Sequence, residues 1–174
     1  LQNFLQQFTS HEPRVDEQGQ PDRRWLDFTA VTKTLEELIM FTTIATNNPD
    51  PITREGLPHM ARQHLLKEQG ILPLTISCIT VPFSTGHFTL EELDTSGVVS
   101  KPSVRWKMIK KDKNQPMSRM ERVVHQKIEN ERTKIGYLRR LGMLCMRLTR
   151  HIIREHQEAK NEAMSYLQKF IQLL

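Results

Sequence analysis

The amino-acid sequence predicts an all-α protein, an armadillo-like α-solenoid or helical bundle of about five to six helices. Apolar residues recur at three- and four-residue spacing along most of the chain, and no stretch alternates convincingly as a strand. The 174 residues include only 7 Gly and 9 Pro, too few for the many tight turns of a β-sandwich or barrel. No apolar run reaches the length of about 18 residues that a bilayer span needs.

The first helical pattern lies in residues 1–10, which we expect to be the end of a preceding helix. Its apolar positions share one face: Leu1, Phe4, Leu5 and Phe8. Residues 11–24 are polar, contain Pro and Gly, and predict a loop. The next pattern opens at Trp25, a packing anchor, and ends near residue 46 at the prolines of "TNNPDP". A residue before proline is disfavoured in the helical conformation, so the helix stops there.

The stretch "HLLKEQGILPLTISCITVPF" predicts a helical corner. A helix over 57–68 leads to Gly70, which supplies the left-handed conformation that ends a helix. A second helix is expected over 71–81, with Pro82 just past its end. Four residues of this corner are expected to face the core: Leu65, Ile71, Leu74 and Cys78.

Two capping boxes follow, "TLEE" at 89–92 and "SRME" at 118–121. The first predicts only a short turn, and the second opens a long helical pattern that runs to Ile152. Glycines inside that pattern are candidate bends, because each costs about 1 kcal/mol relative to alanine in a helix. Its apolar face is Val124, Ile128, Ile135, Leu138, Leu141, Cys145, Leu148 and Ile152. A last helix is expected over 158–174.

The net charge of +5 is unevenly spread. Residues 101–127 hold nine Lys and Arg against two acids, in a segment that also contains Trp106. Such a surplus can meet anionic lipid, nucleic acid or an acidic domain, and it also fits a solvated loop. We interpret about 95–117 as a basic loop insertion tacked to the domain body by Trp106 and its apolar neighbours, and nucleic acid as a disfavoured partner.

Nothing in the sequence supports catalysis, a metal site or a cofactor. The two cysteines, Cys78 and Cys145, lack the spacing of zinc ligands and are expected to be buried free thiols in a reducing compartment. The seven histidines form no metal-binding motif, and no nucleotide-binding or nucleophile motif occurs. The paired carboxylates at 36–37 and 91–92 are interpreted as solvated helix faces.

Four segments in order resemble the RIH domain of inositol trisphosphate receptors and ryanodine receptors. They are "AVTKTLEELIMFTT", "RQHLLKEQGILPLTISCITVPF", "FTLEELD" and "LGMLCMRLTRH", followed by a terminal amphipathic helix. The likeness is greatest to the first RIH domain of the trisphosphate receptors, and it leaves the basic segment 98–134 without a counterpart. It implies that residues 25–174 form an RIH-like helical domain.

The resemblance also implies a setting. The domain would belong to a tetrameric calcium-release channel, on the cytosolic face of the endoplasmic reticulum membrane. Its partners would be a β-trefoil domain and further solenoid of the same subunit. In trisphosphate receptors the ligand's phosphates lie between the β-trefoil and this domain.

The resemblance places the ligand-binding cations of this domain on the helix before the corner and on the last helix. Lys67 keeps a positive charge, whereas His64 stands where a lysine is expected and Met60 where an arginine is expected. Arg62 is a nearby cation on another face of the helix. A Tyr-Arg-Lys run of the family falls on His156, Gln157 and Glu158 unless a gap brings Lys160 into it. The candidate inositol phosphate ligands are therefore Lys67, His64, Arg62 and Lys160.

Three hypotheses follow for function. The leading one is a non-catalytic solenoid domain that relays conformational change between cytosolic domains of the channel. The second is the ligand-binding half of an inositol trisphosphate site. The third is an independent helical-repeat adaptor that binds anionic lipid or nucleic acid through the basic segment.

Overall fold

The structure, a computed structural model, describes residues 1–15, 22–23, 25–44, 48–94 and 119–171. These ranges contain seven helices and no strand, which confirms the all-α class. The helices are α1 (Gln2–Ser10), α2 (Thr29–Thr42), α3 (Met60–Glu68), α4 (Ile71–Ser84), α5 (Leu90–Asp94), α6 (Arg119–Ile153) and α7 (Gln157–Ile171). Six correspond to predicted helices, and α5 is the short turn predicted at 89–92.

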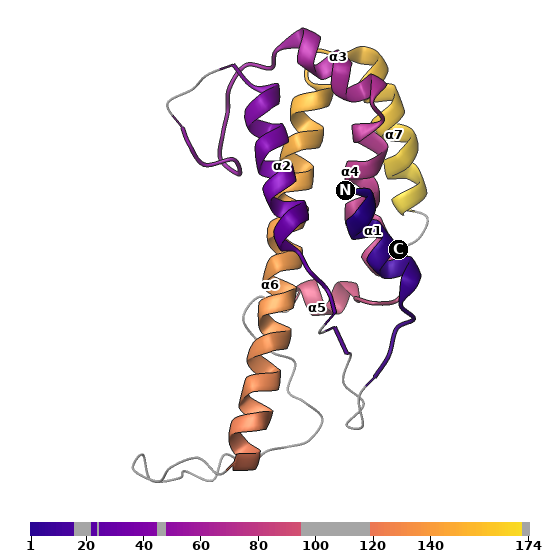
Figure 1. The fold of residues 1–174 in the computed structure, drawn as a ribbon. Coiled ribbons are helices and arrows are strands. Elements are labelled where there is room, and N and C mark those ends of the chain that lie inside the picture. Colours follow the sequence, from indigo (N-terminus) through magenta and orange to yellow (C-terminus); the bar gives the residue numbers. More distant parts are fainter. Residues whose placement is uncertain (16–21, 24, 45–47, 95–118, 172–174) are drawn as a thin grey trace.

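Helix α6 organises the fold. It has 35 residues and is therefore about 52 Å long at 1.5 Å per residue. It contacts α2, α3, α4, α5 and α7, while α1 packs on α4. Figure 1 shows α2 and α4 flanking the second half of α6, α3 across one end, and the first half of α6 extending beyond the other helices. The candidate site lies at the end where α3, α6 and α7 meet.

One hydrophobic core joins α1, α2, α3, α4, α6 and α7. The inner face of α6 supplies Leu138, Leu141, Leu144, Cys145, Leu148 and Ile152. The predicted face is thus confirmed from Leu138 onward, and α6 continues through Gly136 and Gly142 without a break. Phe4 and Phe8 are buried in the same core, so α1 is packed into the domain body.

Two predicted helix starts are wrong, for local reasons, and α2 also ends earlier than predicted, at Thr42 rather than near residue 46. Helix α2 begins at Thr29 rather than Trp25. Phe28 is its N-cap residue, and the Asp27 carboxylate before it accepts a hydrogen bond from the Thr29 N–H (2.8 Å), which stabilises a turn at the start of the helix. Helix α3 begins at Met60 rather than near residue 57, because the preceding residues pair with the segment after α2. The Leu57 carbonyl accepts from the Ile44 N–H (2.9 Å), and the His59 N–H donates to the Thr42 carbonyl (2.9 Å).

Pro82 lies inside α4 rather than past its end. A proline so close to the C-terminus removes a single backbone hydrogen bond, and here its ring is buried in return. The helix ends two residues later, at Ser84, before Gly86 with a φ of 73°.

The predicted core face of the corner is partly wrong. Leu65 is 45% exposed, and its neighbour Leu66 is buried instead. On α4 the buried leucine is Leu72, while Leu74 is half-buried. Leu66 lies about 100° around the helix from Leu65, and Leu72 lies about 200° from Leu74, so the buried faces of both helices are rotated from the predicted ones.

Cys78 of α4 and Cys145 of α6 are buried free thiols, as predicted. The neighbouring Cys78 thiol and then burial raise the pKa of the Cys145 thiol. The basic loop predicted at 95–117, with Trp106, lies outside the described residues, as does Ser118 of the second capping box.

Candidate phosphate-binding corner

The α3–α4 corner has the predicted backbone. Gly70 adopts the left-handed conformation with a φ of 66°. Its N–H donates to the Lys67 carbonyl (3.0 Å), and the Gln69 N–H donates to the Leu65 carbonyl (3.0 Å), which closes the last turn of α3. A side chain at Gly70 would meet no atom within 4 Å, so the conformation rather than space favours glycine here.

Lys67 projects from α3 toward the first turn of α7. Its ammonium group forms a close ion pair with the Glu158 carboxylate. The hydrogen bond from Lys67 is the main cause that lowers the pKa of Glu158, and the same bond raises the pKa of Lys67. The lysine that the resemblance assigns to a phosphate is therefore matched to a carboxylate of the same chain.

His64 lies one turn earlier on α3 and also faces a carboxylate. Its Nε2 is 3.0 Å from the Glu68 carboxylate, in an i,i+4 arrangement. Its ring stacks on that of His156, with centroids 6.0 Å apart and planes 15° apart. His156 in turn caps α7, because its Nδ1 accepts a hydrogen bond from the Ala159 N–H (3.3 Å).

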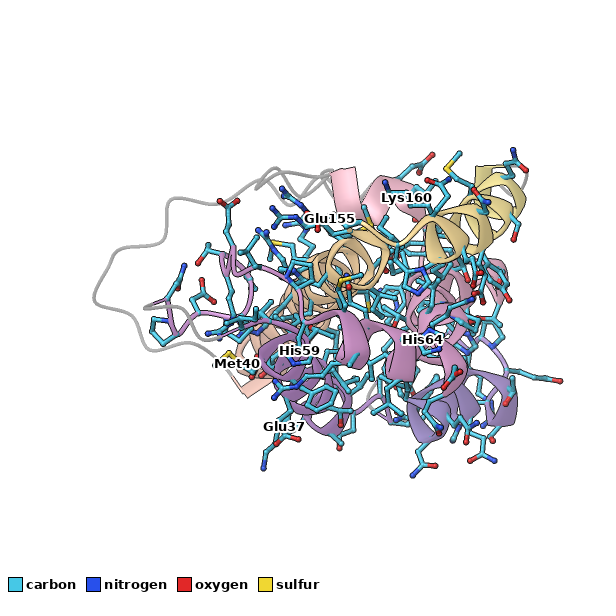
Figure 2. The ribbon with its side chains drawn as sticks, turned by 90° about the horizontal axis from the view of Figure 1, so that it is seen from above. Glu37, Met40, His59, His64, Glu155 and Lys160 are labelled. Carbon is cyan, nitrogen blue, oxygen red and sulfur yellow. The ribbon has the colours of Figure 1, made fainter. Side chains whose placement is uncertain are left out.

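The other two candidates lie elsewhere. The Arg62 guanidinium donates to the Phe41 carbonyl (2.9 Å) and lies 4.9 Å from the centre of the Phe41 ring, so it is directed toward the end of α2. Lys160 is exposed on α7, two residues and so about 200° beyond Glu158. Figure 2 shows Lys160 well separated from His64.

The structure therefore brings together Lys67 and His64 and leaves Arg62 and Lys160 apart from them. Carboxylates from both helices enter the same corner: Glu68 contacts His64, Glu158 contacts Lys67, and Glu162 is close enough to raise the pKa of Lys67. An anionic phosphate would compete with these groups. As arranged, the corner ties α3 to α7.

Gln63 also joins helices at this end and was not singled out by the sequence. It is 1% exposed, and its amide donates to the backbone carbonyls of His151 (2.6 Å) and Arg154 (2.8 Å). The His151 carbonyl belongs to the last turn of α6 and the Arg154 carbonyl directly follows it, at the helix end where carbonyls lack intrahelical partners. The sequence feature that could have indicated burial of Gln63 is its position three residues before Leu66, on the same face of the helix.

A second buried polar cluster lies near α5. Arg23 is 3% exposed, and its guanidinium donates to both carboxylate oxygens of Glu92 (2.8 and 2.7 Å) and to the His87 carbonyl (2.7 Å). It also lies 4.0 Å above the Phe88 ring. Glu92 completes its part of the predicted capping box by accepting from the Thr89 N–H (2.9 Å).

The interpretation of the carboxylates at 36–37 and 91–92 as solvent-exposed helix faces is wrong for one residue of each pair. Glu92 binds the buried Arg23, and Glu36 of α2 forms an ion pair with Arg140 of α6 (2.6 Å). The packing role of Trp25 is confirmed: its ring stacks on His11 at 4.3 Å and packs against the core.

Among the described residues, no three histidine, cysteine or acidic side chains are arranged to hold a metal ion. No helix in the described ranges has both the length and the apolarity needed to cross a membrane. Comparison of the chain with protein-family models, with curated proteins and with solved structures found no match.

Proposed function

We propose that this chain is a non-catalytic helical domain that relays conformational change between neighbouring cytosolic domains of an intracellular calcium-release channel. Two kinds of support are available. The four ordered segments resemble an RIH domain, and the polar groups at the candidate corner are engaged in contacts between helices. The proposal includes a β-trefoil and further solenoid of the same subunit as partners, in a homotetramer at the endoplasmic reticulum membrane.

The Lys67–Glu158 ion pair is the observation that favours relay over ligand binding. It connects α3 directly to α7, while Gln63 connects α3 to α6. All three helices share one core, so a displacement of α3 by a neighbouring domain has packed contacts through which to reach α7.

The ligand-binding alternative is tested by isothermal titration with inositol trisphosphate, using this domain joined to its native neighbours. We expect weak or absent binding. Submicromolar binding that Lys67→Ala abolishes, and that the matched exposed-lysine variant Lys33→Ala keeps, would overturn the relay proposal in favour of a ligand site.

The relay itself is tested in the assembled channel with Lys67→Glu, Glu158→Lys and the double exchange. Each single change places like charges together, so we expect it to shift the ligand concentration for half-maximal calcium release, and the double exchange to restore that concentration. Unchanged release by both single variants would count against a relay through this contact. Channel assembly, checked by size-exclusion chromatography, is the control.

A further inference from the structure

The outer face of α6 carries a continuous exposed seam. Its members are Gly136, Arg139, Met143, Met146 and Arg150, all exposed. They follow one another at spacings of three, four, three and four residues, the pattern by which one helix presents a stripe to another. The seam spans 15 residues, 136–150, or about 21 Å along the helix axis.

The centre of the seam is apolar. Met143 is 50% exposed and Met146 is 59% exposed, one turn apart. The residues between them, Leu144 and Cys145, are buried on the opposite face against the other helices. The seam methionines are therefore not required by the core that the described residues form. Methionine is a flexible apolar side chain that adapts to a docked partner.

The border of the seam is cationic. Arg140, Arg147 and Arg154 follow at seven-residue spacing along one side, and residues 134–154 contain six Lys and Arg and no acid. Arg140 is engaged by Glu36. Within the described part of the chain, the side chains of Arg147 and Arg150 have no ion-pair or hydrogen-bond partner. Burial lowers the pKa of the nearby His151, and the charges of Arg147, Arg150 and Arg154 lower it further.

We propose that this seam of α6 docks an acidic amphipathic helix of a partner protein, whose apolar residues cover Met143 and Met146 and whose carboxylates pair with Arg147 and Arg150. The seam spacing supplies the geometry, and the Arg147 and Arg150 side chains, in a stretch of α6 that contains no acid, supply the charge complementarity. This inference uses α6 alone and does not depend on the channel assignment.

A helix fits this surface better than nucleic acid or a lipid headgroup does. Phosphate backbones are bound by cations and, for single strands, by exposed aromatic rings. The centre of the seam instead presents two methionines. Planar carboxylates pair bidentately with arginine, and a helix carrying them beside leucines would satisfy the border and the centre together.

Fluorescence titration of the full chain with a designed peptide tests the proposal. The probe is a three-heptad peptide with leucine at the first and fourth positions of each heptad and glutamate on both sides of them. We expect saturable binding that weakens with salt and falls about tenfold in Arg147→Glu/Arg150→Glu. Met143→Ser/Met146→Ser is also expected to weaken it, because the apolar centre is lost. Arg14→Glu/Lys33→Glu, which makes the same charge change on exposed residues outside α6, is expected to bind normally.

A charge-exchanged probe guards against a variant that fails to fold. The same peptide with lysine in place of glutamate is expected to bind Arg147→Glu/Arg150→Glu and not the parent chain. The proposal is overturned if a scrambled peptide of equal composition binds equally, or if the methionine variant is unaffected. It is also overturned if polyuridylate RNA or phosphatidylserine vesicles bind more tightly through the same arginines. Sedimentation showing a dimer that occludes the peptide would overturn it in favour of a second copy.

Discussion

At the scale of single residues, Glu155 is the described non-glycine residue with a positive φ, 62°. It follows α6 and turns the chain into α7, the position where glycine usually ends a helix. A left-handed conformation costs a residue with a Cβ about 1–2 kcal/mol. The Glu155 side chain is exposed, and its carboxylate lies 3.9 Å from the Arg154 guanidinium, a long distance for an ion pair. The strain at this corner is therefore not offset by a strong contact of the side chain.

Glu155→Gly is accordingly expected to stabilise the protein by about 0.5–1 kcal/mol, after allowance for the greater freedom of glycine in the unfolded chain. Chemical denaturation followed by circular dichroism measures the difference. Glu155→Ala is the matched control, because it removes the carboxylate and keeps the Cβ. Equal stability of the two variants would show that the backbone conformation is not the cause.

At the scale of elements, α3 is held to the bundle by its polar face as much as by its apolar one. It is nine residues long, too short to be stable alone, and its buried residues are Gln63 and Leu66. The Gln63 amide ties it to the last turn of α6. The Lys67–Glu158 pair lies at the surface, where ion pairs contribute little to stability. Gln63 is thus the stronger link.

Gln63→Met keeps the approximate volume and removes both donated hydrogen bonds. It leaves one buried and one partly buried carbonyl without this partner, so we expect a loss of about 2–3 kcal/mol in the free energy of unfolding. Gln69→Met, at an exposed position just beyond α3, is expected to change stability by less than about 0.5 kcal/mol. If Gln63→Met lowers the free energy of unfolding no more than Gln69→Met does, water replaces the hydrogen bonds of the Gln63 amide at no cost in stability.

At the scale of the whole molecule, sequence periodicity was enough to predict an all-helical fold, because each major helix has an apolar stripe with clear spacing. The inner face of α6 and the turn at Gly70 followed from that spacing and from glycine chemistry. What it could not locate were contacts between distant segments. The pairing of residues 57–59 with the end of α2, and the burial of Arg23 against Glu92, depend on residues 13 to 69 positions apart in the chain.

The candidate site illustrates the same limit. Local spacing placed Lys67 and His64 on one helix, but their partners lie partly on α7, and Glu158 becomes a partner only when α7 folds back. By contrast, the sequence does show that residues 134–154 contain no acid. The denser basic segment before them drew attention away from this stretch. Only the fold shows which arginines of residues 134–154 share the exposed side of α6.

Stability of the whole molecule should depend on pH through His151. This side chain is 2% exposed in the core near α3, and burial, assisted by Arg147, lowers its pKa from 6.5 to about 4. Because the folded pKa is below the unfolded one, the unfolded chain binds the extra proton between these values. Acidification from pH 6.5 to 4 therefore favours unfolding, at about 1.4 kcal/mol per unit and so by about 3 kcal/mol in full.

Urea denaturation at a series of pH values between 7 and 4 measures this effect, and His151→Leu should remove most of it. His87 remains in that variant and adds a smaller slope of the same sign, because burial lowers its pKa as well. The hydrogen-bonded carboxylates Asp27, Asp50 and Glu158 have lowered pKa values, so their contributions are lost mainly at the acid end of this range and below it. His59→Gln, at an exposed position, should keep the parent slope. A parent protein equally stable at pH 7 and pH 4.5 would mean that His151 reaches water or a partner in the folded state, and that this end of α6 is more open than its packing indicates.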